Sequence, residues 1–356
     1  MKILLLGEYS SLYKNLKEGL IELGHEAVTA SRGDGFKHIT SDIDFRSKKK
    51  GFLGKVETKI LPFMRMNELK NFDVVQIINP FEFSYKEIHP KFFHQFIIDN
   101  NGKFFISAAG DDAFFWRFGR KYLRYGPFDD FLKFDVHQKK YWMESDRSFL
   151  FNKWLVSKSA GVIPIMYEYE VSYKDEKKRL QTIPIPINTK KIEYKENFVG
   201  KKIVVFHGLN RYGFKGTRHV EEAFNYLREK YPNDLELIID GKMPLNEYLD
   251  VMRRTNVVID QMYSHSLGVN GIYALAMGKI VMGGGEPESL ESLGVRKSPV
   301  INLQPSAESI IKEVENILER RTSVRDIGYE SRKFAENVHG YINVAKQYVD
   351  VWNKSQ

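Results

Sequence analysis

The chain has 356 residues, of which 42% are hydrophobic and 28% charged, and its formal net charge is +8. This composition suits a soluble globular protein of two domains, and the absence of cysteine excludes disulfides and thiolate chemistry. No segment approaches the roughly 18 uninterrupted apolar residues of a membrane span. The opening MKILLLGEYSS is too short and too quickly polar for a secretory signal, which favours a cytoplasmic location.

The positive charge is concentrated in the first half of the chain. Residues 1–190 hold 31 Lys and Arg against 24 Asp and Glu (31 − 24 = +7), whereas residues 191–356 hold 23 against 22 (+1). Such a surface attracts anionic membranes, nucleic acids or phosphorylated substrates, or is simply a solvated basic face. A nucleic-acid-binding function is not indicated, because the chain has no zinc-ligand spacing, ribonucleoprotein motif or heptad-linked basic region. Basic and aromatic residues are mixed in RSKKKGFLGK (46–55), FWRFGRKYLRYG (115–126) and HQKKYWM (137–143).

Strands and helices alternate in the N-terminal half, which predicts a mostly parallel sheet covered on both sides. A helix is expected over 13–25, ended by Gly24. The stretch 111–152 is aromatic and charged. It is either an irregular insertion that faces the substrate or a set of helices whose large side chains are buried in the core. The expected strands are 2–7, 26–31, 73–79, 103–110 and 160–166.

Two prolines alternate with isoleucines at the start of TIPIPINTKKIEYKEN (182–197), so the backbone is extended there and a domain boundary is expected. A second strand–helix series follows. Two such series predict two facing doubly wound sheets, with ligands at the carboxyl ends of their strands and in the cleft between them. The expected strands of this half are 202–206, 235–241, 257–260, 279–284 and 298–303.

The segment HGLNRYGFKGTRH (207–219) joins the strand 202–206 to an amphipathic helix. Backbone N–H groups at a helix start attract anions, and Arg211 and Lys215 add fixed positive charge beside them. The pattern therefore predicts a phosphate-binding turn. The alternative is that both cations only solvate the start of a helix.

Three C-terminal stretches resemble the nucleotide-sugar-binding domain of GT-B glycosyltransferases. They are HGLNRYGFKGTRHVEEAF, LNEYLDVMRRTNVVIDQMY and LGVNGIYALAMGKIVMGGG. The resemblance covers roughly 180–340 and is to the large retaining family, family four, which contains many bacterial polysaccharide enzymes. It implies that Arg211 and Lys215 hold the donor diphosphate without a metal. It also implies that the helix 341–356 crosses back to the first domain, giving domains of 1–183 plus 341–356 and 184–340.

The sequence departs from this family at two positions. The resemblance implies two glutamates eight positions apart, but alignment on the glycine-led helix puts His265 and Tyr273 there. Tyr273 can hydrogen-bond a ribose through its phenol, and His265 can contact a sugar or phosphate. Alternatively, Tyr273 only packs within its helix and His265 is a surface loop residue. Glu286 or Glu288 of GGGEPESL can take over a carboxylate role or serve as a helix-start charge.

The remaining candidates lie at strand ends or helix starts. Asp111 and Asp112 follow a strand and are predicted to orient the acceptor hydroxyl or accept its proton, with helix capping as the alternative for Asp112. Asn270 either contacts ligand or caps its helix. The predicted substrate-binding residues are Gly7, Ser10, Ser11, Gly208, Asp240, Gly241, Tyr263, His265, Gly268, Val269, Asn270 and Tyr273, with Asp240 and Gly241 near the base.

The predicted function is transfer of a sugar from a UDP- or GDP-linked donor to a saccharide or lipid-linked acceptor in bacterial surface polysaccharide synthesis. The basic first half predicts peripheral contact with an anionic membrane at the inner face of the cell membrane. No metal, no cofactor beyond the nucleotide sugar and no nucleic-acid partner are expected. The alternatives are a nucleotide-sugar epimerase of the same fold and a non-catalytic GT-B binding subunit.

Overall fold

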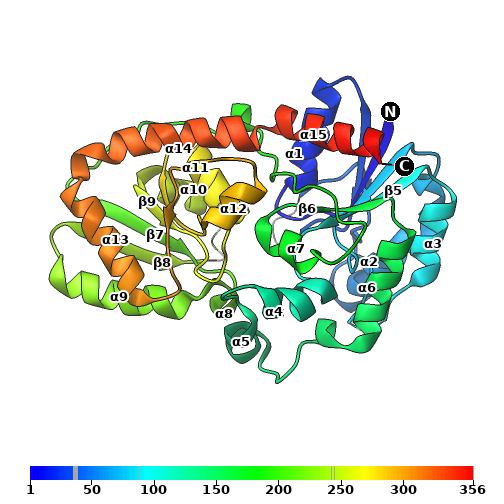
Figure 1. Cartoon of the computed structure of the whole chain (residues 1–356), viewed down its shortest axis with the longest axis horizontal. Helices are drawn as coiled ribbons and strands as arrows, with labels where there is room; N and C mark the ends of the chain where they lie inside the picture. The colour runs from blue at the N-terminus through cyan, green and yellow to red at the C-terminus, as the bar shows by residue number, and fades with distance from the viewer. Residues whose placement is uncertain (35–38, 87, 242, 244, 356) are drawn as a thin grey trace. The chain divides into compact units, whose positions relative to one another are not determined.

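The computed structural model describes residues 1–34, 39–86, 88–241, 243 and 245–355, with backbone alone for 245 and 246 (Figure 1). The chain divides into two compact units. The first unit comprises residues 1–121, 142–188 and 340–356, and the second comprises 122–141 and 189–339. The segment 122–141, which the sequence analysis assigns to the first domain, packs with the second unit.

The first unit is built on a six-stranded parallel sheet with the order β3-β2-β1-β4-β5-β6. Its central strands are almost wholly buried, as their β-branched, leucine and aromatic side chains require. The two-residue strand β3 was not expected from the sequence. The strands are β1 (Lys2–Leu6), β2 (Glu26–Ser31), β3 (Ile43–Asp44), β4 (Val74–Ile77), β5 (Lys103–Ala108) and β6 (Gly161–Pro164).

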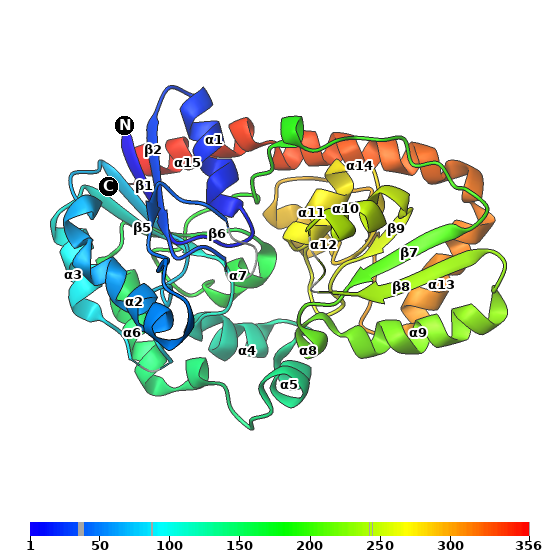
Figure 2. The same ribbon diagram turned by 180° about the vertical axis from the view of Figure 1, so that it is seen from behind.

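The C-terminal helix belongs to the first unit, as the GT-B resemblance implies. Helix α15 (Tyr341–Lys354) lies against α1 (Leu12–Glu22) in both views (Figures 1 and 2). A Cβ on Gly19 would lie 2.4 Å from the Tyr341 carbonyl oxygen, so a glycine is needed where the two helices meet. The Trp352 indole N–H donates to the Gln76 side chain at 2.9 Å. The other long helices of this unit are α2 (Gly51–Met64), α3 (Lys91–Asp99), α6 (Asp146–Lys158) and α7 (Tyr167–Ser172).

The second unit contains a five-stranded parallel sheet with the order β11-β10-β9-β7-β8. Helices α9 and α13 cover one face, and α10, α11 and α14 cover the other (Figures 1 and 2). The strands are β7 (Ile203–Gly208), β8 (Leu235–Asp240), β9 (Val257–Ile259), β10 (Ile280–Gly283) and β11 (Ile301–Asn302). The helices are α5 (Phe128–Asp130), α8 (Tyr212–Lys215), α9 (Thr217–Lys230), α10 (Leu245–Arg254), α11 (Val269–Ala276), α12 (Pro287–Ser292), α13 (Ala307–Glu319) and α14 (Val324–His339).

The predicted fold class of two Rossmann-like parallel-sheet units is confirmed. In each sheet the first strand lies in the middle, and the chain adds strands first on one side of it and then on the other. This reversal of strand order falls between β1 and β4 in the first unit and between β7 and β9 in the second. Ligands of open parallel sheets bind beyond the carboxyl ends of the strands at such a reversal. Within the described part of the chain, no helix is long and apolar enough to cross a membrane.

Candidate functional site

The turn after β7 brings Lys215 back to the end of that strand. Its side chain is only 8% exposed, and Nζ donates to the carbonyl oxygen of Gly208 at 2.9 Å. The next residue, Gly216, has a φ of 69°, and a Cβ there would lie 2.9 Å from the Met262 Cβ. A glycine is therefore required, because the turn packs directly against the loop after β9.

A buried carboxylate lies beside this ammonium group. Asp260 follows β9, is 3% exposed, and accepts the backbone N–H of Gly268 at 2.8 Å. Burial raises the pKa of Asp260, and the nearby Lys215 charge opposes that shift. Lys215 therefore places a buried cation where β7 and β9 meet, at the reversal point of the sheet.

His207 fixes this arrangement without adding charge to it. Its Nδ1 lies 2.9 Å from the Ile259 carbonyl oxygen and its Nε2 lies 3.0 Å from the Thr217 hydroxyl. Burial, followed by the charge of Lys215, lowers the pKa of His207 to about 3. The ring is neutral at pH 7 and links β7, β9 and the start of α9.

Arg211 occupies the N-cap position of α8, one helical turn before Lys215. Its guanidinium carbon lies 3.5 Å from the ring centroid of Phe214 and 4.7 Å from that of Phe131. Contact with two aromatic rings restricts the position of this side chain. The structure thus brings both predicted cations into one loop, with Lys215 buried and Arg211 half-buried.

The glycine-led helix starts at the same edge of the sheet. Gly268 holds the N-cap position of α11, so the alternative of a cap at Asn270 is not what the structure shows. Val269, Asn270 and Tyr273 are half-buried. Tyr273 lies near Tyr248 of α10, and burial, Asp260 and Tyr273 together raise the pKa of Tyr248 to about 12.

His265 is 1% exposed, and its ring stacks on Tyr125 at a centroid distance of 4.1 Å. This burial contradicts the alternative that His265 is a surface loop residue, because the ring packs inside the second unit. Tyr125 comes from the segment 122–141, whose aromatic and charged sequence gave no clear structural pattern. The sequence analysis therefore had no means of pairing these two rings.

Glu286 is the more buried of the two glutamates that follow β10. It is 3% exposed and is bound by Arg124 at 2.7 Å, by the Tyr125 hydroxyl at 2.8 Å and by Gln304 at 2.6 Å. Burial alone would raise the pKa of Glu286, but hydrogen bonds from Asn302 and these three side chains lower it to about 2. Glu286 is thus ionised at neutral pH.

Three other predicted residues of the second unit are Tyr263, Asp240 and Gly241, and their surroundings differ. The Tyr263 hydroxyl donates to Asp130 at 2.6 Å, which ties the segment 122–141 to the loop after β9. Asp240 is exposed and accepts the Gly241 N–H at 2.6 Å. A Cβ on Gly241 would lie 1.6 Å from the Leu209 carbonyl oxygen, so Gly241 permits close packing of two loops.

In the first unit, the loop after β1 carries Gly7, Ser10 and Ser11, all in left-handed backbone conformations. A Cβ on Gly7 would lie 2.3 Å from the Ile78 Cγ2 and 2.9 Å from the Glu82 Cγ. Protein atoms therefore fill the space beside Gly7. Ser10 donates its backbone N–H to Asp34 at 2.9 Å, and Ser11 occupies the N-cap position of α1.

The two aspartates after β5 differ in their surroundings. Asp112 is fully buried, accepts the Phe115 N–H at 2.7 Å and accepts the Tyr173 hydroxyl at 2.6 Å. These contacts match the capping alternative and hold Asp112 away from solvent. Asp111 is half-buried, and its backbone carbonyl accepts the Asn79 side-chain N–H at 3.0 Å. Asp111 is the more exposed member of the pair.

Two further carboxyl groups at this edge were missed in the sequence. Glu8 follows β1 and Glu82 follows β4, and both are buried. Burial raises the pKa of each to about 7, with Asp34 contributing in the same direction. Arg32 lies 3.8 Å from Glu82 and favours its ionised form. The only signal in the sequence is a glutamate shortly after each strand, in LLLGEYSS and NPFEF.

The fold is shared with several solved enzymes. A sucrose-phosphate synthase from Thermosynechococcus elongatus matches over 99% of both chains, with 12% identity and a TM-score of 0.63. HepE from Anabaena, solved with UDP and glucose, matches over 99% of this chain and all of its own, with 11% identity and a TM-score of 0.62. UDP-GlcNAc 2-epimerase from Neisseria meningitidis, bound to UDP-GlcNAc, has the same coverage, 12% identity and a TM-score of 0.55.

No protein-family profile matches the chain, and no curated protein matches its sequence. At identities of 11–12% the structural likeness establishes the GT-B fold but not the reaction. The site residues must therefore carry any argument about function. Among the described residues, no group of three or more His, Asp or Glu side chains is placed to hold a metal ion.

Proposed function

We propose that this protein is a glycosyltransferase that binds a nucleotide sugar at the β7–β9 edge of its second unit. The observation that carries the proposal is the buried Lys215 ammonium group, held by the Gly208 carbonyl at the reversal point of the sheet. Anionic ligands of this fold class bind at such an edge, and a positive charge there attracts them. A donor diphosphate matches both its charge and its position.

The chemistry of sugar transfer requires charge at this point. When the glycosidic bond breaks, negative charge develops on the departing nucleoside diphosphate, and fixed cations stabilise it. Lys215 supplies a point charge and Arg211 a planar fork, which suits two phosphate groups. We propose that these two side chains perform this role without a metal ion.

UDP is the first nucleotide to test, because HepE, which has the same fold, was solved with UDP. The base is proposed to lie near Asp240 and Gly241 at the end of β8, while Tyr273 offers a phenol to the ribose. The proposed acceptor is a saccharide or lipid-linked saccharide of surface polysaccharide synthesis. This last point is supported only by the sequence resemblance, as is retention of the anomeric configuration.

The first unit supplies groups suited to an acceptor hydroxyl. Asp111 is half-buried at the end of β5, while Glu8 and Glu82 have pKa values of about 7 near the same edge. Carboxyl groups with such values can accept a proton at neutral pH. We propose that Asp111 orients the hydroxyl and that Glu82 is the next candidate for receiving its proton.

The decisive experiment incubates the full-length protein with UDP-glucose, UDP-GlcNAc and GDP-mannose, with and without a panel of saccharide acceptors. Release of nucleoside diphosphate that depends on acceptor and persists in EDTA supports a metal-independent transferase. The anomeric configuration of the product, read by NMR, tests retention. Tight nucleotide binding with no turnover on any acceptor would instead indicate a non-catalytic binding subunit.

A nucleotide-sugar epimerase is the second candidate. It requires acid–base groups, and the structure supplies Glu8 and Glu82 with pKa values near neutrality. An epimerase with the same fold is known. Proton NMR of a nucleotide sugar incubated without any acceptor separates the two candidates, because only an epimerase then accumulates a new sugar while the nucleotide stays attached.

A further inference from the structure

Helix α2 of the first unit turns its apolar side chains toward solvent. Leu53, Val56, Ile60 and Met64 are spaced three or four residues apart and therefore share one face, beside Phe52. Their exposed fractions are 78% for Phe52, 70% for Leu53, 37% for Val56, 46% for Ile60 and 72% for Met64. These five residues are called the α2 stripe. A surface helix normally buries such a stripe against the core.

The opposite side of α2, which carries Gly54, Thr58, Leu61 and Pro62, faces the protein. A Cβ on Gly54 would lie 2.0 Å from the Lys49 carbonyl oxygen, and Pro62 is buried. The Thr58 hydroxyl accepts the backbone N–H of Ser47 at 3.0 Å. The helix is thus inverted relative to the usual amphipathic arrangement.

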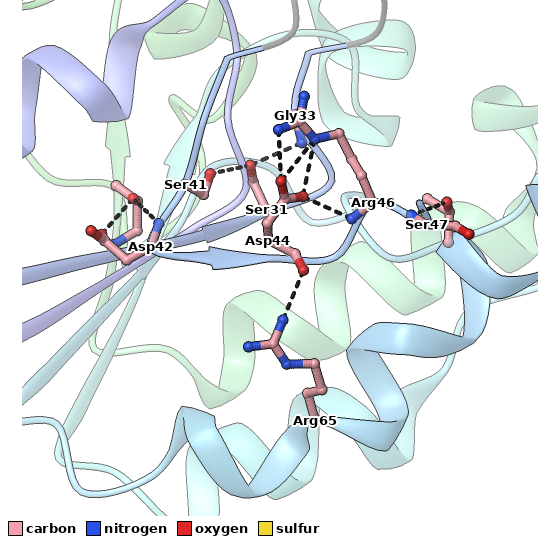
Figure 3. A network of polar contacts seen from close by, with 10 residues as sticks. Ser31, Gly33, Ser41, Asp42, Asp44, Arg46, Ser47 and Arg65 are labelled. Atoms are coloured by element: carbon pink, nitrogen blue, oxygen red, sulfur yellow. Dashed lines mark hydrogen bonds and ion pairs between the residues drawn. The ribbon is translucent and has the colours of Figure 1, made fainter. Parts of the chain in front are cut away.

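Polar contacts hold the middle and the C-terminal end of α2 to the residues of and after the strand β3 (Figure 3). In the middle of the helix, the Ser47 hydroxyl donates to Glu57. At the end, Arg65 donates to the backbone carbonyl of Asp44 at 2.8 Å, and the Asp44 carboxylate is in turn held by Arg46 at 2.6 Å. These anchors keep the α2 stripe turned outward.

Positive charge surrounds the α2 stripe. Residues 46–65 contain seven basic residues and one acidic residue, Glu57, which pairs with Lys49 at 3.3 Å. Lys55 and Lys59 lie four residues apart on the flank of the stripe, next in sequence to Val56 and Ile60. The other exposed lysines precede the helix at 48, 49 and 50. A second copy of the same surface would be repelled by this charge.

We propose that α2 docks on an anionic lipid surface, with the α2 stripe among the acyl chains and the lysines at the headgroups. Apolar side chains flanked by lysines are the features by which interfacial helices bind such membranes. Phe92 of α3 is 62% exposed, and its neighbour in space, Phe63, lies 5.4 Å away between ring centroids, so the apolar surface extends beyond α2. The docking does not depend on nucleotide chemistry.

The test is flotation of the full-length protein with vesicles of phosphatidylcholine alone or mixed equally with phosphatidylglycerol. Binding is expected with the mixed vesicles and is expected to weaken as salt is raised, because screening acts on the lysines. Leu53→Gln with Ile60→Gln is expected to lower the affinity at least tenfold, since each side chain loses its burial in the lipid. Ile21→Gln is the matched control, because Ile21 is 51% exposed on α1 of the same unit.

A second pair of variants separates charge from apolar contact. Lys50→Gln with Lys55→Gln is expected to weaken binding to the mixed vesicles only, whereas Lys201→Gln with Lys297→Gln, exposed positions of the second unit, leaves it unchanged. Equal flotation of wild type and the Leu53/Ile60 variant overturns the proposal. Failure of the wild-type protein to bind the mixed vesicles also overturns it, whether or not the protein forms a dimer through α2. Circular dichroism and UDP titration in solution confirm that each variant remains folded and report separately on the nucleotide site.

Discussion

The carboxyl edges of the two sheets are topologically alike but chemically opposite. At the β7–β9 edge a buried lysine lies beside Asp260, with a histidine held neutral by burial. At the β1–β4 edge Glu8 and Glu82 are buried and hold their protons to about pH 7. The same topology thus gives one edge suited to an anion and another suited to proton exchange. The fold fixes where ligands bind, whereas a few side chains fix which chemistry takes place.

The largest expected effect comes from removing the buried ammonium group of Lys215. Lys215→Met should reduce turnover with the preferred donor at least ~100-fold, because a fixed donor of transition-state stabilisation is lost. The same change should weaken UDP binding measured by calorimetry. Lys201→Met, at an exposed position of the same unit, is the control. Unchanged UDP affinity in Lys215→Met would show that the phosphates bind elsewhere.

That variant leaves Asp260 buried beside a neutral side chain, so loss of folding must be distinguished from loss of binding. Lys215→Met combined with Asp260→Asn removes both charges and is expected to stay folded. It should still fail to bind UDP tightly. Recovery of UDP affinity in the double variant would contradict the proposed role of Lys215.

The first edge predicts a stability that falls as pH rises. The pKa of Glu82 is about 7 in the folded protein and 4.5 ordinarily, so the folded state binds the proton more tightly. Protonated Glu82 contributes about 3 kcal/mol to the free energy of unfolding below pH 4.5. This contribution is lost as the pH rises to about 7. Glu82→Gln should flatten this part of the profile in urea denaturation at pH 5, 6 and 7.5. If the stability of Glu82→Gln changes with pH as steeply as that of the wild type, the raised pKa of Glu82 is disproved.

The turn at the second edge should depend on its glycine. Gly216→Ala is expected to cost about 2 kcal/mol, because a left-handed φ and a clash with Met262 act together. Gly24→Ala is the matched control, with a φ of 79° and no atom within 4 Å of the added Cβ. Denaturation midpoints should therefore fall further for Gly216→Ala. Equal decreases in the denaturation midpoint of the two variants would show that the loop after β9 moves to accommodate the added methyl group.

The smallest expected effect concerns Glu286, whose pKa of about 2 lies below its usual 4.5. Its contribution is present above pH 4.5 and is lost as pH falls toward 2, the opposite sign from Glu82. Glu286→Gln should cost about 1 kcal/mol at pH 7 through weaker hydrogen bonds with Arg124 and Tyr125. Urea denaturation at pH 7 and pH 3.5 should show that wild type and variant differ less in free energy of unfolding at the lower pH. An unchanged difference would contradict the ionised state of Glu286.

The sequence by itself determined the two strand–helix series, most strand positions and the loop that carries Arg211 and Lys215. These features are local: β-branched runs mark strands, and glycines with cations mark a helix start. The unusual segment RSKKKGFLGK was also visible, although its pattern could not show which face of the helix is exposed. Short β3 escaped detection because two residues hold no periodic pattern.

Only the tertiary structure decided which polar groups are buried together. Asp260 beside Lys215, Tyr125 on His265 and Glu82 beside Gly7 join residues that are far apart in the sequence. Their burial sets the charge state of each group, because removing a carboxylate or imidazole from water disfavours its charged form. Nothing in the local pattern shows that α2 turns its apolar face to solvent, since that orientation depends on polar anchors to β3.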